Sequence, residues 1–246
     1  MVRVAGEVLK PGNYDIWRGE RLSQVLIRAG GLTPFAYAYG AVFQRARVKE
    51  EKRLHYQRAG IEMQNSVLMM VARQKRTAAG GTDPNTFAAM KGLSEELKKV
   101  EPSGRVVVEA DPAVLQVHPE LDVVLEPGDE IVIPKRPSHV VVMGEVLTPG
   151  AVQFRSGLRA EDYLRAAGGV GMAGDEGRTY MILPNGSAQP LKVASWNAQP
   201  TPVPPGSVIY VPRDPLPLDN TALFQIVLEM AKDIALSAAA LYGVTK

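Results

Sequence analysis

The residues best able to do chemistry are three histidines and three pairs of carboxylates, and their spacing indicates no catalytic or metal site. His55, His118 and His139 are far apart and stand in unrelated contexts, whereas metal-binding histidines recur at short, fixed spacings. The acidic pairs fall at a predicted turn or on predicted helix faces, where solvation explains them: Asp129-Glu130, Glu161-Asp162 and Glu95-Glu96. No nucleophile-elbow, phosphate-loop or zinc-protease motif occurs in the sequence. We therefore expect no enzyme, no metal and no cofactor.

Composition narrows the function classes further. The chain has no cysteine, so it forms neither a disulfide nor a thiolate nucleophile. Its formal net charge is +2, and Lys and Arg are interspersed with Asp and Glu. A nucleic acid partner is not expected, because such binding requires a basic patch.

Four charged residues occupy matched positions because the chain contains one segment twice. Residues 4–31 read VAGEVLKPGNYDIWRGERLSQVLIRAGG, and residues 142–169 read VMGEVLTPGAVQFRSGLRAEDYLRAAGG, without a gap between them. The matched charged residues are Glu7 with Glu145 and Arg21 with Arg159. Each could bind sugar hydroxyls, but in a repeated scaffold a structural hydrogen bond or ion pair is the favoured interpretation.

Each copy of the segment predicts a small α+β unit. In the first copy, a valine-rich strand leads through a Pro-Gly turn into a second strand at 14–17, and a helix follows at about 22–29. Gly30 fits the left-handed position that ends a helix. Each repeat closes with a Pro-Gly turn and an alternating Val/Ile strand, LEPGDEIVIPKRP at 125–137 and VPPGSVIYVPRDP at 203–215. A hairpin, a crossing helix and further strands predict the β-grasp fold.

These motifs resemble the soluble-ligand-binding β-grasp (SLBB) domain through GEVLKPGNY, LIRAGGLT and PGDEIVIP. Their tandem order, with a helix at the end, resembles outer-membrane polysaccharide export proteins of the capsule and exopolysaccharide translocon type. We accordingly expect an α+β chain with SLBB domains at 1–137 and 138–215 and a C-terminal helix at 216–246. Export lipoproteins of this kind carry a signal peptide and a lipidated cysteine, neither of which is present here, so we expect a C-terminal fragment.

A stretch at about 44–104 interrupts the first predicted domain. Helical spacing at 44–74 and at 86–100, with a glycine turn between them, predicts a helical hairpin. Two interpretations stay open. The hairpin is either a solvated decoration or a contact with a neighbouring subunit or periplasmic partner, since loop insertions commonly build such contacts.

The segment 216–246 predicts an amphipathic α-helix with three distinct faces. The polar arc consists of Gln225, Glu229, Lys232, Asp233 and Ser237. The aliphatic face consists of Leu223, Val227, Met230, Ile234 and Leu241. Small residues that let helices approach closely recur every four positions, at Ala231, Ala235, Ala239 and Gly243.

Its stretch from Asp219 to Gly243 would be about 36 Å long as a helix, enough to cross a hydrocarbon core of about 30 Å. A charge at bilayer depth must face protein or water, so a single span is unfavourable. A ring of identical helices places the polar arc on a hydrated lumen, the aliphatic face on lipid and the small residues between neighbours. The alternative is a helix that packs on the β-grasp domains or lies flat on a membrane.

The resemblance implies a component of an oligomeric translocon that exports capsular polysaccharide or exopolysaccharide from the periplasm of a Gram-negative bacterium. The polymer would pass a ring of β-grasp domains and a transmembrane helical pore in the outer membrane. The implied partners are further copies of the chain, the polysaccharide and the inner-membrane co-polymerase and export machinery. The alternative is a periplasmic glycan-binding or ligand-binding module whose last helix packs on its own domain or on a membrane surface.

Overall fold

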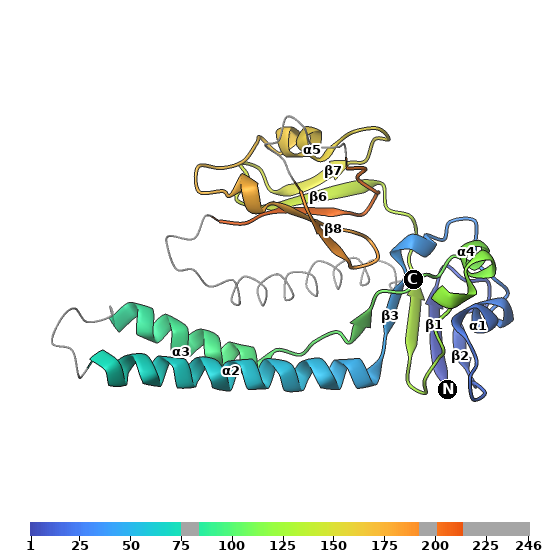
Figure 1. Cartoon of the computed structure of the whole chain (residues 1–246). Helices are drawn as coiled ribbons and strands as arrows, with labels where there is room; N and C mark the ends of the chain where they lie inside the picture. The colour runs from blue at the N-terminus through green and yellow to red at the C-terminus, as the bar shows by residue number, and fades with distance from the viewer. Residues whose placement is uncertain (75–83, 192–200, 214–246) are drawn as a thin grey trace. The chain divides into compact units, whose positions relative to one another are not determined.

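The computed structural model describes residues 1–74, 84–191 and 201–213, and it contains two five-stranded mixed sheets (Figure 1). Their strand orders are β2-β1-β5-β3-β4 and β7-β6-β10-β8-β9. Corresponding strands of the two repeats therefore have the same neighbours in their sheets. The α+β fold is therefore confirmed, and the repeated segment builds the same sheet twice.

In the first sheet, the first and last strands of the repeat lie side by side at the centre. The strands are β1 (Val2–Gly6), β2 (Gly12–Tyr14), β3 (Val42–Gln44), β4 (Arg105–Val106) and β5 (Glu130–Ile133). β1 pairs antiparallel with β2 and parallel with β5. A parallel pair requires a crossover connection, and α1 (Leu22–Arg28) lies within that connection.

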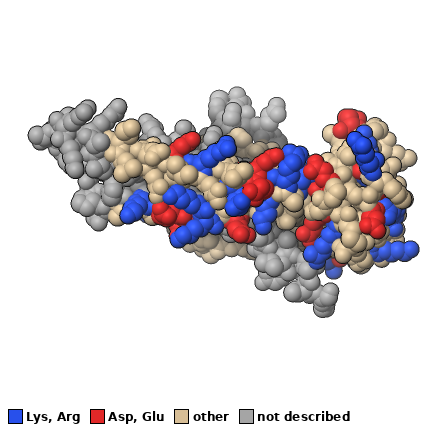
Figure 2. Space-filling view, turned by 90° about the horizontal axis from the view of Figure 1, so that it is seen from below, with Lys and Arg blue, Asp and Glu red and all other residues tan. Residues whose placement is uncertain are grey.

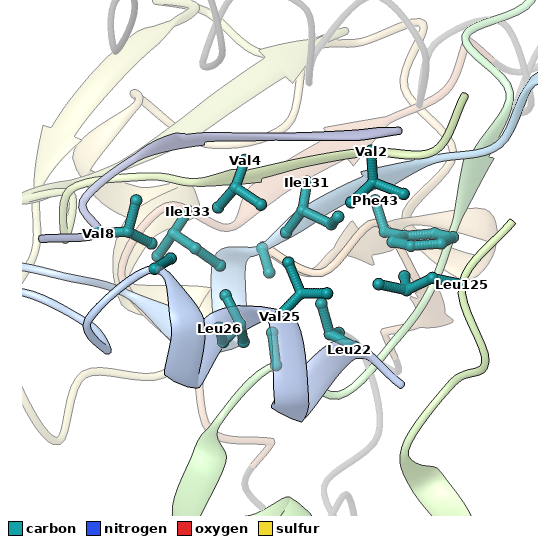
Figure 3. Packing of buried hydrophobic residues seen from close by; sticks show 13 residues of the cluster. Val2, Val4, Val8, Leu22, Val25, Leu26, Phe43, Leu125, Ile131 and Ile133 are labelled. Atoms are coloured by element: carbon teal, nitrogen blue, oxygen red, sulfur yellow. The ribbon is translucent and has the colours of Figure 1, made fainter. Parts of the chain in front are cut away.

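α1 packs on this sheet and closes the first hydrophobic core (Figure 3). Its residues Leu22, Val25 and Leu26 are fully buried. They lie among apolar side chains of the strands and of the loop before β5: Val2, Val4, Phe43, Leu125, Ile131 and Ile133. Full burial of each large aliphatic side chain contributes about 1.5–3 kcal/mol, so the helix is held mainly by this one face.

The second sheet repeats the arrangement with its own core. The strands are β6 (His139–Gly144), β7 (Gly150–Gln153), β8 (Tyr180–Ile182), β9 (Ala188–Pro190) and β10 (Val208–Val211). β6 pairs antiparallel with β7 and parallel with β10. The helix α5 (Ala160–Ala166) buries Tyr163 and Leu164 in the second core. The remaining short helices are η1 (Ala38–Gly40), α4 (Pro112–Val117), η2 (Pro119–Leu121) and η3 (Glu176–Arg178).

The end of the first strand in each repeat requires glycine. Gly6 has φ of +82° and Gly144 has φ of +92°, which L side chains rarely adopt. A Cβ at Gly6 would lie 2.1 Å from the Ile133 carbonyl oxygen, and one at Gly144 would lie 2.0 Å from that of Val211. The parallel neighbour strand therefore approaches so closely that only glycine fits, which explains why both copies of the segment carry it.

The second strand of the first repeat begins two residues earlier and ends three residues earlier than the predicted strand at 14–17. The Pro-Gly turn closes sooner, because Val4 pairs directly with Gly12. The backbone N–H of Trp17 donates to Glu20 Oε2 at 2.9 Å and takes no part in a strand ladder. A side chain later in the loop thus draws the backbone out of the sheet at this point.

Residues 44–105 form a separate compact unit, which consists mainly of α2 (Ala46–Gln74) and α3 (Pro84–Lys99). The two helices pack against each other beside Gly60, where a Cβ would lie 2.9 Å from the Ser94 carbonyl oxygen. Gln64 also donates to Glu95 across the pair. None of the helices in the described part of the chain has the length and hydropathy of a membrane span.

Candidate functional site

The residues predicted to form a pore lie outside the described part of the chain. They are predicted to face its lumen, to face lipid or to pack between neighbouring helices. They are Gln225, Glu229, Lys232, Asp233 and Ser237, then Leu223, Val227, Met230, Ile234 and Leu241, and finally Ala231, Ala235, Ala239 and Gly243. Their roles stay predictions. Among the described residues, His, Cys, Asp and Glu form no group of three that could hold a metal ion.

The charged residues at matched positions of the two repeats make structural bonds. Glu7 accepts a hydrogen bond from the Thr33 hydroxyl, and Glu145 lies 3.4 Å from the Arg213 guanidinium. Arg21 Nη1 donates to the Asp122 carbonyl oxygen at 2.5 Å. These contacts join loop segments that are distant in sequence, and they agree with the structural interpretation favoured from the sequence.

A pocket of about 420 Å³ lies on the first repeat, between the end of β2 and the outer face of α1. We call it the Trp17 pocket. Its lining residues are Trp17, Arg18, Gly19, Glu20, Gln24, Ile27 and Arg28. Trp17 and Ile27 are each 70% exposed, so the pocket offers water a wide apolar surface. Small-molecule sites typically enclose 300–1,000 Å³, and this pocket falls within that range.

The buried carboxylate of Glu20 joins the loop of the pocket to the helix α1. Glu20 is 4% exposed, and both of its oxygens are engaged. Oε2 accepts from the backbone N–H of Trp17, and Oε1 lies 2.8 Å from Arg28 Nη1. A buried carboxylate is tolerated only when it is paired and hydrogen-bonded in this way. Glu20 therefore fixes the loop and the helix with respect to each other.

Arg28 positions the indole ring from the helix. Its guanidinium carbon lies 4.7 Å from the Trp17 ring centroid and 5.5 Å from that of Tyr14. Arg28 Nη1 also donates to the Asp15 carbonyl oxygen at 2.8 Å. A cation over an aromatic face is attracted by the ring quadrupole, by about 0.5–1 kcal/mol at an exposed site. The contact with Arg28 thus favours one orientation of the exposed Trp17 side chain.

The second repeat closes the same loop with different chemistry. The residues that match Trp17, Glu20 and Arg28 are Arg155, Leu158 and Ala166. There the backbone N–H of Arg155 donates to the hydroxyl of Tyr163 at 3.1 Å, and the same hydroxyl donates back to the Arg155 carbonyl oxygen. One buried tyrosine replaces the carboxylate, the arginine and the indole. The aromatic and charged pocket is therefore a property of the first repeat.

A second aromatic group in the first repeat lies at residues 35–39. Lys135 Nζ is 5.1 Å from the Phe35 ring centroid, and the Arg136 guanidinium carbon is 5.8 Å from that of Tyr37. Burial raises the pKa of Tyr37 to about 12, an effect that Arg136 partly opposes. A tyrosine with this pKa stays neutral at physiological pH.

The charges of the molecule are mixed. On the face that Figure 2 shows, Lys and Arg side chains alternate with Asp and Glu, and no broad area has one sign. This agrees with the interspersed charges of the sequence.

The sequence contained a signal for the Trp17 pocket, but it lay in the differences between the repeats. Searching for shared residues selects the scaffold, because shared residues such as Gly6 and Arg21 shape the loop and the sheet. The pocket residues are those that the second copy replaces. Comparing the copies position by position for lost aromatic and charged residues would have singled out Trp17, Glu20 and Arg28.

Comparison with known proteins defines the class. Residues 1–51 match the family model of the SLBB domain, and residues 148–234 match that of the capsule biosynthesis GfcC C-terminal. The first match includes the whole Trp17 pocket. The chain is thus related to SLBB-containing polysaccharide export proteins, and the resemblance identified from the sequence motifs is confirmed over these segments.

Three relatives make the relation more specific. The chain is 32% identical over 127 residues to the polysialic acid transport protein KpsD of Escherichia coli, covering 52% of this chain and 23% of KpsD. A second KpsD of the same species is 31% identical over 126 residues, which cover 51% of this chain and 22% of the relative. The uncharacterized protein YjbG of Escherichia coli strain K12 is 26% identical over 153 residues, which cover 62% of this chain and 60% of YjbG. The chain therefore spans less than a quarter of the transport proteins that it matches.

Proposed function

We propose that this chain is a non-enzymatic component of polysaccharide export in the envelope of a Gram-negative bacterium. The observation that carries the proposal is its similarity to two proteins named for polysialic acid transport. The match to a capsule biosynthesis family over the second repeat supports it independently. The engagement of Glu7, Arg21 and Glu145 in structural bonds also supports a scaffold role for the repeats.

The finer proposal is a translocon. The SLBB domains, taken as 1–137 and 138–215, would form stacked periplasmic rings, and 216–246 would contribute one helix per copy to an outer-membrane pore. In that barrel the polar arc around Asp233 lines the lumen, and the line through Ala235 seats neighbouring helices. A wide hydrated channel passes a flexible polar polymer through many weak contacts. The driving force would come from the inner-membrane co-polymerase and export machinery.

The helices α2 and α3 form an insertion in the first SLBB domain under this proposal, and we assign it a contact with a neighbouring copy. Leu54, Ile61 and Leu68 are 42%, 51% and 63% exposed, and they recur every seven residues along α2. This spacing places them on one side of the helix, where they form an apolar stripe. Such a stripe suits a helix of an adjacent subunit better than open solvent.

The alternative function is a periplasmic glycan-binding module, and the Trp17 pocket is the observation that favours it. A pocket on a single repeat gives a discrete binding site, whereas a passive channel needs only weak, distributed contacts. In this alternative the last helix packs on its own domain or on a membrane surface.

The role in export is tested in cells that lack the protein. Surface polysaccharide measured on intact cells should fall strongly and return when the full-length protein is supplied. Unchanged surface polysaccharide in the deletion strain would reject the role in export.

The translocon is tested by light scattering of the detergent-extracted protein, with and without residues 216–246. A large closed oligomer that collapses without this segment supports the ring. Ala235→Leu should have the same effect while both domains still fold, because a larger side chain separates neighbouring helices. A monomer in every form rejects the ring and favours the binding module.

A further inference from the structure

The Trp17 pocket has the chemistry of a binding site, and the role as scaffold or channel does not require it. A single exposed apolar side chain is ordinary on a protein surface. Trp17 differs because its backbone is fixed by a buried carboxylate and its ring is fixed by a guanidinium. The second repeat builds the same loop without these residues, so the fold does not need them. They are an addition to the scaffold.

Three side chains of the pocket, Arg18, Gln24 and Arg28, offer hydrogen-bond donors to a ligand. Gln24 Oε1 already accepts from the backbone N–H of Arg21 at 2.9 Å, which leaves its Nε2 group for another partner. Arg28 is engaged through Nη1, which leaves Nη2. Arg18 is exposed and makes no hydrogen bond or ion pair within the described part of the chain. The occupant must therefore be rich in acceptors, such as hydroxyl and carboxylate oxygens.

The charged side chains of the pocket indicate the charge of the ligand. The carboxylate of Glu20 offsets the guanidinium of Arg28, with which it is paired at 2.8 Å. Among the residues that the structure describes, Arg18 forms no ion pair, and it contributes a positive charge at the rim. An anionic ligand gains a charge-assisted hydrogen bond from Arg18 that a neutral ligand of the same shape lacks. Both carboxylate oxygens of Glu20 are engaged, so neither is directed at the ligand.

The apolar surface fixes the shape of the occupant. The indole of Trp17 and the side chain of Ile27 present a broad surface next to the donors. A sugar ring has one face of C–H bonds, and their weak positive charge is attracted to the negative face of an aromatic ring. Its hydroxyl groups point outward in the ring plane and are free to accept hydrogen bonds. Since Arg28 lies over one face of the indole, the opposite face is the one that a sugar ring would stack on.

We propose that the Trp17 pocket binds one anionic sugar unit, a uronic or sialic acid, of a polysaccharide chain. This inference rests on the proposed function, which makes a polysaccharide the cargo. The sugar ring stacks on the face of Trp17 that Arg28 leaves open, its carboxylate pairs with Arg18, and its hydroxyls accept hydrogen bonds from Gln24. The proposed site lies on the first repeat, and Arg155, Leu158 and Ala166 stand at the positions of Trp17, Glu20 and Arg28 in the second repeat.

The experiment is a titration of the full chain with short oligosialic acid, chosen because two relatives are named for the transport of polysialic acid. Trp196→Phe leaves Trp17 as the sole tryptophan, since the sequence has two. We expect the emission of Trp17 to change with saturation as the oligosaccharide is added. By calorimetry, Trp17→Ala should weaken binding at least tenfold, and Arg18→Gln about threefold with a smaller dependence on salt.

The matched control is Arg155→Gln, which removes an exposed arginine at the position in the second repeat that corresponds to Trp17. It should leave the affinity unchanged. Equal weakening by Arg155→Gln would reveal unspecific charge attraction and overturn the proposal. Equal affinity for a neutral dextran oligosaccharide of the same length would overturn the anionic class, and unchanged affinity in Trp17→Ala would overturn the site. Since Trp17 is exposed, Trp17→Ala should keep the unfolding midpoint of the parent chain.

This test separates the inference from the proposed function. If oligosialic acid does not bind but the protein restores surface polysaccharide in deletion cells, the sugar site is rejected and the export role stands. If it binds as expected but the deletion does not alter surface polysaccharide, the export role is rejected and the sugar site stands.

Discussion

The two repeats share a strand order but differ in two places. Between β3 and β4, the first repeat carries the helices α2 and α3, whereas the second repeat joins β8 to β9 through a tight turn. That turn is closed by Asn185 Oδ1, which accepts from Ser187 N at 3.0 Å. The loop before the first helix is held by Glu20 and Arg28 in the first repeat, whereas the helix residue Tyr163 holds it in the second.

Comparing the two repeats distinguishes the residues that the fold requires from the residues that are available for binding. Positions where the repeats agree, such as Gly6 and Gly144, are those where the backbones of parallel strands come closest. Positions where they disagree lie on a loop and on the outer face of a helix, where many side chains are compatible with the fold. New chemistry can accumulate there without loss of the sheet. Four predictions test this comparison.

The largest effect is expected from a methyl group at the shared glycines. Gly6→Ala and Gly144→Ala should each lower the free energy of unfolding of their own repeat by about 4 kcal/mol, because positive φ and overlap with a carbonyl oxygen both oppose the alanine. Urea denaturation monitored by circular dichroism measures the loss. Gly12→Ala and Gly150→Ala are matched controls, because no atom lies within 4 Å of a Cβ at either position. A loss at Gly6 no larger than at Gly12 would contradict the close approach.

A smaller effect is expected where the repeats support the same loop differently. Glu20→Leu introduces the residue of the second repeat, and it should cost about 2 kcal/mol, because the Trp17 N–H loses its acceptor and Arg28 loses its partner. Tyr163→Phe removes a neutral hydroxyl and should cost about 1 kcal/mol. Adding Arg28→Ala to Glu20→Leu should recover part of the loss. Equal and additive losses in a double-mutant cycle would show that Glu20 and Arg28 do not act together.

The two repeats should also respond to pH at opposite extremes. Tyr37 precedes η1 and Asp175 precedes η3 at the same place in each repeat. Burial raises the pKa of Tyr37 from 10.0 to about 12, so its contribution to stability is complete below pH 10 and is lost as the pH rises to about 12. For Asp175, burial alone would raise the pKa, but Arg178 outweighs it and holds the pKa below 3.8. That contribution is present above pH 3.8 and is lost as the pH falls further.

Urea denaturation across both pH ranges measures these two losses. Tyr37→Phe should remove only the alkaline loss, and Asp175→Asn should remove only the acid loss. A change of both slopes by one substitution would contradict the assignment.

The smallest effect is expected from exchanging the connections. Replacing residues 45–104 with residues 183–187 gives the first repeat the short turn of the second. The free energy of unfolding of the first sheet should change by less than about 1 kcal/mol, since loop length alters closure entropy only slowly and 44–105 is compact by itself. Hydrogen exchange of the amides of β1 and β5 measures it. Loss of their protection would mean that the helices are part of the core.

Much of the scaffold could be predicted because its signals are local and occur twice. The Pro-Gly turn before Gly12, the helix that buries Leu26 and the final Val/Ile strand each depend on residues close together in sequence. The end of β2 could not be predicted, because Trp17 is drawn away by Glu20 through a bond that propensity does not encode. The pocket was missed for the same reason: Glu20 and Arg28 reveal their pairing only when helix and loop are folded together.

The presence of two copies of one α+β unit can be predicted from the sequence alone, because the repeat and its turn and strand patterns are visible along the chain. The sequence alone also indicated the family resemblance, which rests on those same short motifs. The position of β1 between β2 and β5 became evident only from the tertiary structure, as did the hydrogen bonds by which Glu7 and Arg21 join loops. Only the tertiary structure placed Trp17, Glu20 and Arg28 around one pocket. The physical reason is that strand pairing and buried ion pairs join residues distant in sequence, and their free energy depends on a burial that exists only in the folded molecule.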